Sequence, residues 1–524
     1  MPPGVSVAFL LVAILSTGLH ADTVKPPTKQ YKILVYLSKF GHSHCNFVGN
    51  IADVLVEAGH NVTTLLPNVN VKMADGTSKS NKIHVKMDED TIQMYTDMMH
   101  SQMDFFDTSN YDLVAAIMQR RFFSQLFAAV CKTTINTPGL MEMLRDEKFD
   151  VLLTETFDVC GMGMVPFIKP RSTIVLSTSD FFGAQYEEIG VVQAVSHNPS
   201  LFTTKLNVHS MVDRFWNLIG DWMWRIQFGM VRPLTDIVLR ERFGEDYPDV
   251  MEIASHSAYA FINAEPLISP ATPTLNKVIN IGGIGAKEPK PLDKSWQEIL
   301  SRRERTVLIS FGSVTQSRLL KPAAKDAILK TVSTFPNITF IWKYEDPNDE
   351  FGKGQAAAVD NLVLSKWMPQ NDLLNDPRVV VFISHAGMGS TQETARRGTP
   401  AIFVPLFGDQ PRNAFMMQEN GLAKEVLEDK SLAERCKRKS RMLADKPFNA
   451  KELLVKHVEF AAEYGPSESL RPESLDMTIV ELYNLDIIAV ALVVVLAAVI
   501  TSLYAVNSIL KRCLKLPTAK TKTS

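Results

Sequence analysis

The chain is poor in cysteine and has no excess of charge. Its 524 residues include 5 cysteines, with no CxxC pair and no Cys/His spacing of the kind that binds zinc. A zinc module and a disulfide scaffold are therefore not expected, and free or partly paired thiols are. The 55 Lys and Arg residues stand against 57 Asp and Glu residues, which gives a net charge of −2. This balance argues against a nucleic-acid-binding protein.

Long apolar runs occur at the two ends of the chain. The first, Val5 to Leu15, has the length of a signal-peptide core, and small residues follow it, so residues 1–21 are expected to be a signal peptide. The second, residues 487–506, is long enough to cross about 30 Å as a helix and predicts a single transmembrane segment. Residues 507–524 then form a short tail.

Charges around the second run predict its orientation. Lys511, Arg512 and Lys515 follow the run, whereas Glu481 and Asp486 precede it. Because basic residues favour the cytosolic side, we expect a type I protein with a cytosolic tail and with residues 22–470 across the membrane.

The tail and two sequons bear on the compartment. Lys522 and Lys520 lie three and five positions from the carboxyl end and resemble a dilysine endoplasmic-reticulum retrieval signal. A solvated basic tail on anionic lipid is the alternative. The sequons at Asn61 and Asn337 agree with a lumenal location. We therefore expect an endoplasmic reticulum membrane protein whose main domains are lumenal.

The 46% apolar content can bury two cores, and strands alternate with helices in both halves of the chain. In the first half, strands are predicted at Tyr31–Leu37 and Asn61–Leu66, on either side of a helix at Phe47–Ala58. A stretch rich in Gly, Pro and Lys, residues 282–294, separates the halves. The pattern predicts an α/β protein of two Rossmann-like, doubly wound domains facing a cleft, at residues 22–285 and 286–470.

The most informative block begins with the buried strand Val379–Ser384, which is followed directly by His385. Gly387 and Gly389 permit a tight turn into a helix that starts near Ser390 and closes at Gly398. The N-terminus of this helix then points at the carboxyl end of the strand. Free N–H groups and the helix dipole favour a diphosphate there, with His385 as a further donor.

The same block supplies groups suited to a nucleoside and a sugar. Glu393 could face the vicinal hydroxyls of a ribose, and a second strand delivers Asp409 and Gln410 to the edge where open α/β sheets bind ligands. Upstream, Trp367 could stack on a flat base while Gln370 bonds to its edge. The order and spacing of these residues indicate a nucleotide-sugar site.

Over these residues the chain closely resembles the UDP-glycosyltransferase family, of the membrane-bound UDP-glucuronosyltransferase type. The resemblance implies the GT-B fold, with the acceptor bound by the first half and the donor by the second. It also implies an enzyme that needs neither a cofactor nor a metal. The implied donor contacts are Trp367 on uracil, Gln370 on the nucleoside, His385, Ser313, Gly387, Gly389 and Ser390 at phosphate, Glu393 at ribose, and Asp409 with Gln410 at the sugar.

His44 matches the position of the catalytic base in this family, and an imidazole titrates near the working pH. His42 is the competing base. Glu155 follows a strand where the family usually has aspartate, and we expect it to orient His44, with Asp158 as the alternative. A second departure is Ala386 in place of a glycine, which matters if that position needs a positive φ.

The expected function is transfer of glucuronate or glucose from the UDP-sugar to a small lipophilic hydroxyl compound, by single displacement with inversion. Because of Glu155, Ala386 and a stretch at residues 425–446 that is about one helix shorter than the family's pattern, the alternative is a catalytically silent UDP-sugar-binding membrane protein. A homo-oligomer is compatible with either.

Two apolar stretches each fit two interpretations. The residues between Ile92 and Phe106 are rich in Met and aromatics and suit either core packing or an acceptor surface. The aromatic residues between Phe215 and Met230 fit either the membrane interface or a core helix.

Overall fold

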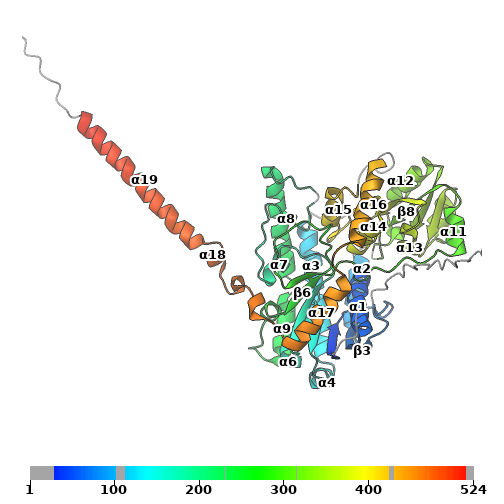
Figure 1. Cartoon of the computed structure of the whole chain (residues 1–524), viewed down its shortest axis with the longest axis horizontal. Coiled ribbons are helices and arrows are strands. Elements are labelled where there is room, and N and C mark those ends of the chain that lie inside the picture. The colour runs from blue at the N-terminus through cyan, green and yellow to red at the C-terminus, as the bar shows by residue number, and fades with distance from the viewer. Residues whose placement is uncertain are drawn as a thin grey trace, which may run out of the picture.

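The computed structural model describes residues 29–101, 113–203, 205–230, 232–313, 315–423 and 430–514. The predicted signal peptide, the tail from residue 515 and the segment from Met103 to Phe106 lie outside these residues. Two parallel sheets, each covered by helices, make up the described body (Figure 1).

The first sheet has seven parallel strands in the order β3-β2-β1-β4-β5-β6-β7. Its strands are β1 Lys32–Tyr36, β2 Asn61–Asn68, β3 Asn81–Lys86, β4 Val151–Glu155, β5 Ser172–Ser177, β6 Tyr259–Ile262 and β7 Val278–Asn280. Ile33 in β1 pairs with Val62 on one side and Val151 on the other, so the strand order reverses between β1 and β4. Ligands of such sheets bind at the carboxyl ends of the strands at this point.

Helices cover both faces of this sheet, and β4 and β5 are therefore buried along their whole length. They are α1 His42–Glu57, α2 Glu89–Ser101, α3 Leu113–Ile135, α4 Leu140–Asp146, α5 Cys160–Gly163, α6 Val165–Ile168, α7 Gly183–Glu188, α8 Met211–Gly229, α9 Arg232–Phe243 and α10 Val250–Ser255. Ile92, Met94 and Met99 in α2 pack against the core, and Tyr95 is part of it. Core packing therefore accounts for the described part of the Met-rich stretch.

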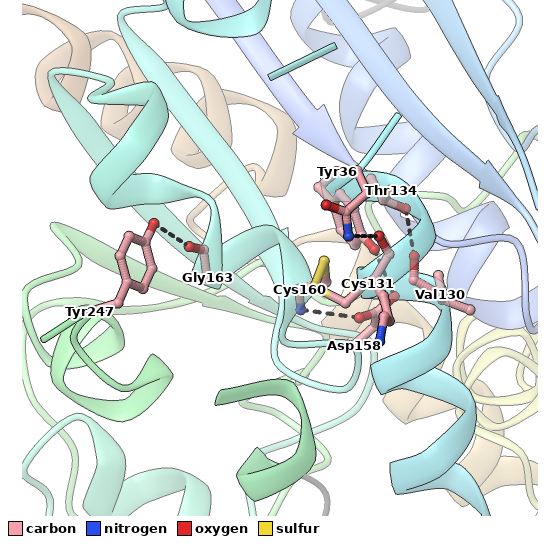
Figure 2. The surroundings of a disulfide bond; sticks show 10 residues. Tyr36, Val130, Cys131, Thr134, Asp158, Cys160, Gly163 and Tyr247 are labelled. Atoms are coloured by element: carbon pink, nitrogen blue, oxygen red, sulfur yellow. Dashed lines mark hydrogen bonds between the residues drawn. A yellow bond between two sulfur atoms is a disulfide. The ribbon is translucent and has the colours of Figure 1, made fainter. Parts of the chain in front are cut away.

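A disulfide joins Cys131 in α3 to Cys160 in α5 (Figure 2). Cys45 and Cys436 are free and buried. The cysteines with described side chains are thus partly paired, as the low cysteine count predicts.

The second sheet is also parallel, with five strands in the order β10-β9-β8-β11-β12. Its strands are β8 Arg305–Ser310, β9 Ile338–Lys343, β10 Leu362–Ser365, β11 Val379–Ser384 and β12 Ala401–Phe403, and its helices are α11 Lys294–Leu300, α12 Pro322–Ser333, α13 Gln370–Leu374, α14 Met388–Arg397, α15 Gln410–Glu419 and α16 Lys430–Ala444. Here the strand order reverses between β8 and β11. Within residues 425–446, the stretch expected to be shortened, Lys430–Ala444 form α16, which packs against α14.

The carboxyl-terminal part of the chain returns to the first sheet before it leaves the body. In α17, Ala450–Tyr464, the side chains of Leu454, Val455 and Val458 are buried in the core of the first half. The range 286–470 expected for the second half therefore ends with a helix that belongs structurally to the first half.

Beyond α17, the short helix α18, Ile479–Leu482, leads into α19, Leu485–Leu514, which projects away from the body (Figure 1). Within α19, residues Leu485–Arg512 have a mean hydropathy of 2.8 over the most apolar window, none of which is buried. By length and composition α19 can span a bilayer, as predicted.

Candidate active site

His44 and Glu155 meet at the carboxyl edge of the first sheet. Glu155 is the last residue of β4, and His44 lies in the first turn of α1, which begins at His42 and not at Phe47 as the sequence predicts. Nδ1 of His44 lies 2.5 Å from Oε1 of Glu155. Because an ionised carboxylate only accepts, Nδ1 carries the proton and Nε2 has a free lone pair.

Thr178, which follows β5, completes this group. Its hydroxyl donates to the same Oε1 of Glu155 and lies 3.1 Å from Nδ1 of His44. Nothing in the local sequence singles out Thr178, although it follows a strand of the same sheet. A hydroxyl and an imidazole on one carboxylate oxygen fix the orientation of the imidazole ring.

Asp158 does not contact His44. Its carboxylate accepts hydrogen bonds from the hydroxyl of Tyr36 and the backbone N–H of Cys160, at 2.9 and 3.1 Å. Burial raises the pKa of Asp158 to about 6. Of the two acids proposed as partners of His44, the structure therefore places Glu155 in contact.

Aromatic rings surround His44. The ring centroids of Phe40 and Phe157 lie 4.4 and 5.3 Å from that of the imidazole, and Phe123 and Phe127 pack against Phe157. Such a surface suits an apolar ligand next to a base.

In the second half, His385 follows β11 and its ring is packed between two glycines. A Cβ added at Gly312 or Gly387 would come within 2.6 or 2.7 Å of Nε2 of His385. Burial, and then the charge of Lys343, lowers the pKa of His385 to about 4. The ring is therefore neutral at neutral pH and keeps one N–H donor.

The turn after His385 has a strained residue. Ala386 has φ of 64°, in the left-handed region, and its side chain is fully buried. An L-residue other than glycine pays roughly 1–2 kcal/mol there. The turn forms nonetheless, and α14 follows with Gly387 as its N-cap and Gly398 closing it at φ 68°. At Gly389, a Cβ would meet no atom within 4 Å.

Lys343 is a residue of this edge that the sequence analysis missed. It ends β9, is 9% exposed, and its ammonium group donates to the carbonyl of Gly312. The ammonium also lies 5.7 Å from the centroid of the Trp367 ring, which is itself 74% exposed. The sequence signal that could have identified Lys343 is a basic residue at the carboxyl end of a buried strand. Ser313, the residue after Gly312, is exposed.

The residues expected at the nucleoside lie together on α13 and α14. The amide of Gln370 donates to Oε2 of Glu393 at 2.6 Å and to the hydroxyl of Ser390 at 3.2 Å. Burial raises the pKa of Glu393. This set is arranged around the N-terminal turns of α14.

Asp409 and Gln410 lie where α15 begins. Asp409 accepts from the amide of Asn413 at 2.8 Å, and burial raises its pKa, while the hydrogen bond from Asn413 acts in the opposite direction. The carbonyl of Gln410 accepts from the backbone N–H groups of Leu406 and Phe407. Both side chains are thus held by local contacts around the start of α15.

A series of hydrogen bonds connects α14 to the His44–Glu155 pair. The amide of Gln392 donates to the backbone and side-chain oxygens of Asn263, both at 2.9 Å. The amide of Asn263 donates to the backbone carbonyl of Thr178 at 2.9 Å. Since Thr178 bonds to Glu155, an unbroken path runs from the proposed donor helix to the proposed base. Nothing in the local sequence around Gln392 or Asn263 indicates this contact.

A family model described as "UDP-glucoronosyl and UDP-glucosyl transferase" matches residues 31–520. The chain belongs to this family. The transferase is 26% identical to a putative UDP-glucuronosyltransferase of Caenorhabditis briggsae, over 90% of this chain and 91% of that one. It is also 26% identical to UDP-glucuronosyltransferase 1A3 of Rattus norvegicus, over 89% and 90% of the two chains.

Solved glycosyltransferases share the fold of this transferase. UGT2 of Phytolacca americana, in complex with UDP-2fluoro-glucose and pterostilbene, aligns over 83% of this chain with a TM-score of 0.53 and 14% identity. The calicheamicin glycosyltransferase CalG4 aligns over 84%, also with a TM-score of 0.53. The two parallel sheets are therefore those of a GT-B glycosyltransferase, as the sequence predicts.

Proposed function

We propose that the enzyme transfers glucuronate or glucose from the UDP-sugar to the hydroxyl of a small lipophilic acceptor. The contact between His44 and Glu155, which hydrogen bonds through Thr178 and Asn263 connect to Gln392 in α14, is the observation that carries this proposal. The base of the first half is thereby linked to the helix that would hold the donor.

Nε2 of His44 accepts the proton of the acceptor hydroxyl as the oxygen attacks the anomeric carbon. The new carbon–oxygen bond forms while the bond from that carbon to the phosphate oxygen breaks, so the configuration inverts. Glu155 stabilises the imidazolium that forms, and Thr178 holds the carboxylate. The aromatic rings of Phe40 and Phe157 favour an apolar acceptor beside the base.

UDP leaves with increased negative charge at the N-terminus of α14. Backbone N–H groups there, the neutral ring of His385 and the ammonium of Lys343 would stabilise the leaving phosphate. Trp367 would stack on uracil, and Glu393 would accept from the ribose hydroxyls. Because the carbonyl of Gln410 is already bonded, this residue would offer its amide nitrogen to the sugar.

The alternative is a silent UDP-sugar-binding protein. Glu155, Ala386 and the shortened stretch at residues 425–446 motivate it, and the contact of Glu155 with His44 stands against it. Incubation of the purified full chain with radiolabelled UDP-glucuronate or UDP-glucose and a panel of lipophilic alcohols and phenols separates the two. Transfer from one donor is expected, and binding of both without transfer would favour the silent protein.

For the location, we infer a single-pass type I protein of the endoplasmic reticulum membrane, with α19 in the bilayer and both halves lumenal. The Cys131–Cys160 disulfide supports an oxidising compartment. Protease protection in sealed microsomes tests the orientation, because a lumenal body is protected until the membrane is opened.

A further inference from the structure

The helix α8, Met211–Gly229, buries polar as well as apolar side chains on its inward face. Its inward face places Asn217 and Asp221 beside Trp224 and Phe228, and all four are buried. Asn217 donates to the carbonyl of Val195 at 2.6 Å, and Asp221 accepts from Arg225 at the same distance. These polar side chains, of a kind that normally faces water on a surface helix, are therefore buried and hydrogen-bonded within the protein.

The outward face of α8 is apolar. Apart from Gly229, every exposed residue of α8 whose side chain is described is a large hydrophobic one: Met211, Val212, Phe215, Trp216, Leu218, Trp222 and Ile226. Trp222 and Met211 are 64% and 76% exposed. A continuous apolar helix face of this kind on a soluble surface marks an interaction site, and Trp is typical of the membrane interface.

The chain leaves for α19 from the same part of the body. Arg225 and Arg232, at the end of α8 and the start of α9, form ion pairs with Glu187 and Glu188 of α7. Just after α7, the carbonyl of Gly190 accepts from the hydroxyl of Ser474 at 2.6 Å. Ser474 belongs to the connection that runs to α18 and α19. In Figure 1, α8 lies on the side of the body from which α19 projects.

We propose that the outward face of α8 lies on the bilayer that α19 spans, as a second membrane contact of the body. The helix lies in the interface plane, with its apolar side chains about 5–10 Å into the boundary between headgroups and acyl chains. The bilayer is the occupant because the connection to α19 is bound next to α7 and α8, and because the exposed face has no charge to desolvate. A second copy of the chain is the competing occupant.

Labels on the full chain in lipid nanodiscs test this contact. Cys513→Ser is the background, since Cys45 and Cys436 are buried, and a nitrobenzoxadiazole fluorophore is attached at Trp222→Cys. The matched control carries the label at Lys330→Cys, an exposed position on α12 in the other half. Spin-labelled lipids with the nitroxide near the headgroup end of the acyl chain should quench the label at 222 by roughly twofold or more and leave that at 330 unchanged.

Three outcomes are distinguishable. Quenching by lipid at 222 that disappears in Phe215→Glu/Leu218→Glu supports the proposal, and since both substituted residues are exposed the fold should tolerate the change. Access of aqueous iodide to the label at 222, without lipid quenching, overturns it. Protection from both quenchers, with energy transfer between differently labelled chains, overturns it in favour of a second copy. None of these readouts depends on transferase activity.

Discussion

Lys343 tests the electrostatics of the proposed donor site at the scale of one residue. Its ammonium lies between the carbonyl of Gly312 and the ring of Trp367, and its charge lowers the pKa of His385. A diphosphate bound there would gain a charge-assisted contact. We predict that Lys343→Met weakens UDP binding by roughly tenfold, measured by calorimetry, which corresponds to about 1.4 kcal/mol.

Lys330→Met is the matched control, because Lys330 is an exposed lysine on α12. It should bind UDP like the unaltered enzyme. Equal affinity in the Lys343 and Lys330 variants would remove Lys343 from the donor site.

The pKa of His385 predicts a dependence of stability on pH. The folded pKa, about 4, is below the value of about 6.5 expected in the unfolded chain. Between these values the unfolded chain binds the extra proton, so the free energy of unfolding falls as the pH is lowered from 6.5 toward 4. We predict that His385→Gln makes this fall less steep, by up to about 1.4 kcal/mol per pH unit. Urea midpoints of the two proteins across this range measure it. Parallel curves would show that the ring is not neutral when folded.

Single residues were predicted unevenly. The positions that follow strands, such as His385 and Glu155, are visible in the sequence because the carboxyl ends of parallel strands share one edge. Lys343 also ends a strand at this edge, but nothing in the sequence around it distinguishes that strand from an ordinary buried one. Whether Glu155 or Asp158 faces His44 depends on the turn after β4, which directs Asp158 to Tyr36 instead.

At the scale of elements, α14 contributes to the proposed donor site and is also hydrogen-bonded to the residues beside the proposed base. It carries Ser390 and Glu393 toward the donor and, through Gln392, reaches Asn263 and Thr178 beside the base. Gln392→Leu removes both hydrogen bonds to Asn263 while keeping a side chain of similar size. We predict a fall in kcat of roughly tenfold with unchanged affinity for UDP.

Arg396→Met is the control for this prediction, because Arg396 lies on the same helix and also contacts the first half, at the carbonyl of Gly282. This contact does not lead to Thr178, so its loss should affect kcat much less. Equal losses in both variants would mean that any contact between the halves matters, and not this path.

The elements themselves were largely predictable. The strand Val379–Ser384 has the predicted bounds, and the next helix closes at Gly398, because β-branched runs and glycine stops are local signals. The start of α1 was wrong because its N-cap, Gly41, makes no side-chain capping bond and leaves no mark in the sequence. Which apolar residues of α8 face outward could not be predicted from the sequence, because it depends on which side of the helix packs against the body.

At the scale of the whole molecule, a buried ion pair holds the halves together. Arg412 in α15 donates to Asp180 of the first half at 2.9 Å and to the carbonyl of Pro199, and both charged side chains are almost fully buried. Arg412→Met leaves the buried carboxylate of Asp180 unpaired. We predict a loss of about 3–5 kcal/mol in the free energy of unfolding, measured with urea.

The double variant Arg412→Met/Asp180→Leu provides the comparison. Because it removes both charges, it should recover a large part of the loss. Additive losses would indicate that the two residues act independently.

The path of the chain between the halves was beyond sequence analysis. Alternation of strands and helices predicts two sheets, but the return of α17 to the first core depends on which surface its apolar face meets. The same holds for the pairs Arg412–Asp180 and Gln392–Asn263, whose members are far apart in the chain. Such contacts are set by the packing of whole domains and leave no local pattern.

The central claim is that His44 from the first half acts as base on an acceptor while the second half holds UDP. His44→Ala, assayed for sugar transfer and for UDP binding in the same preparation, tests it most directly. We predict loss of transfer by a factor of roughly 100 or more, with the dissociation constant for UDP unchanged. Retained transfer in a variant that still binds UDP would contradict the account.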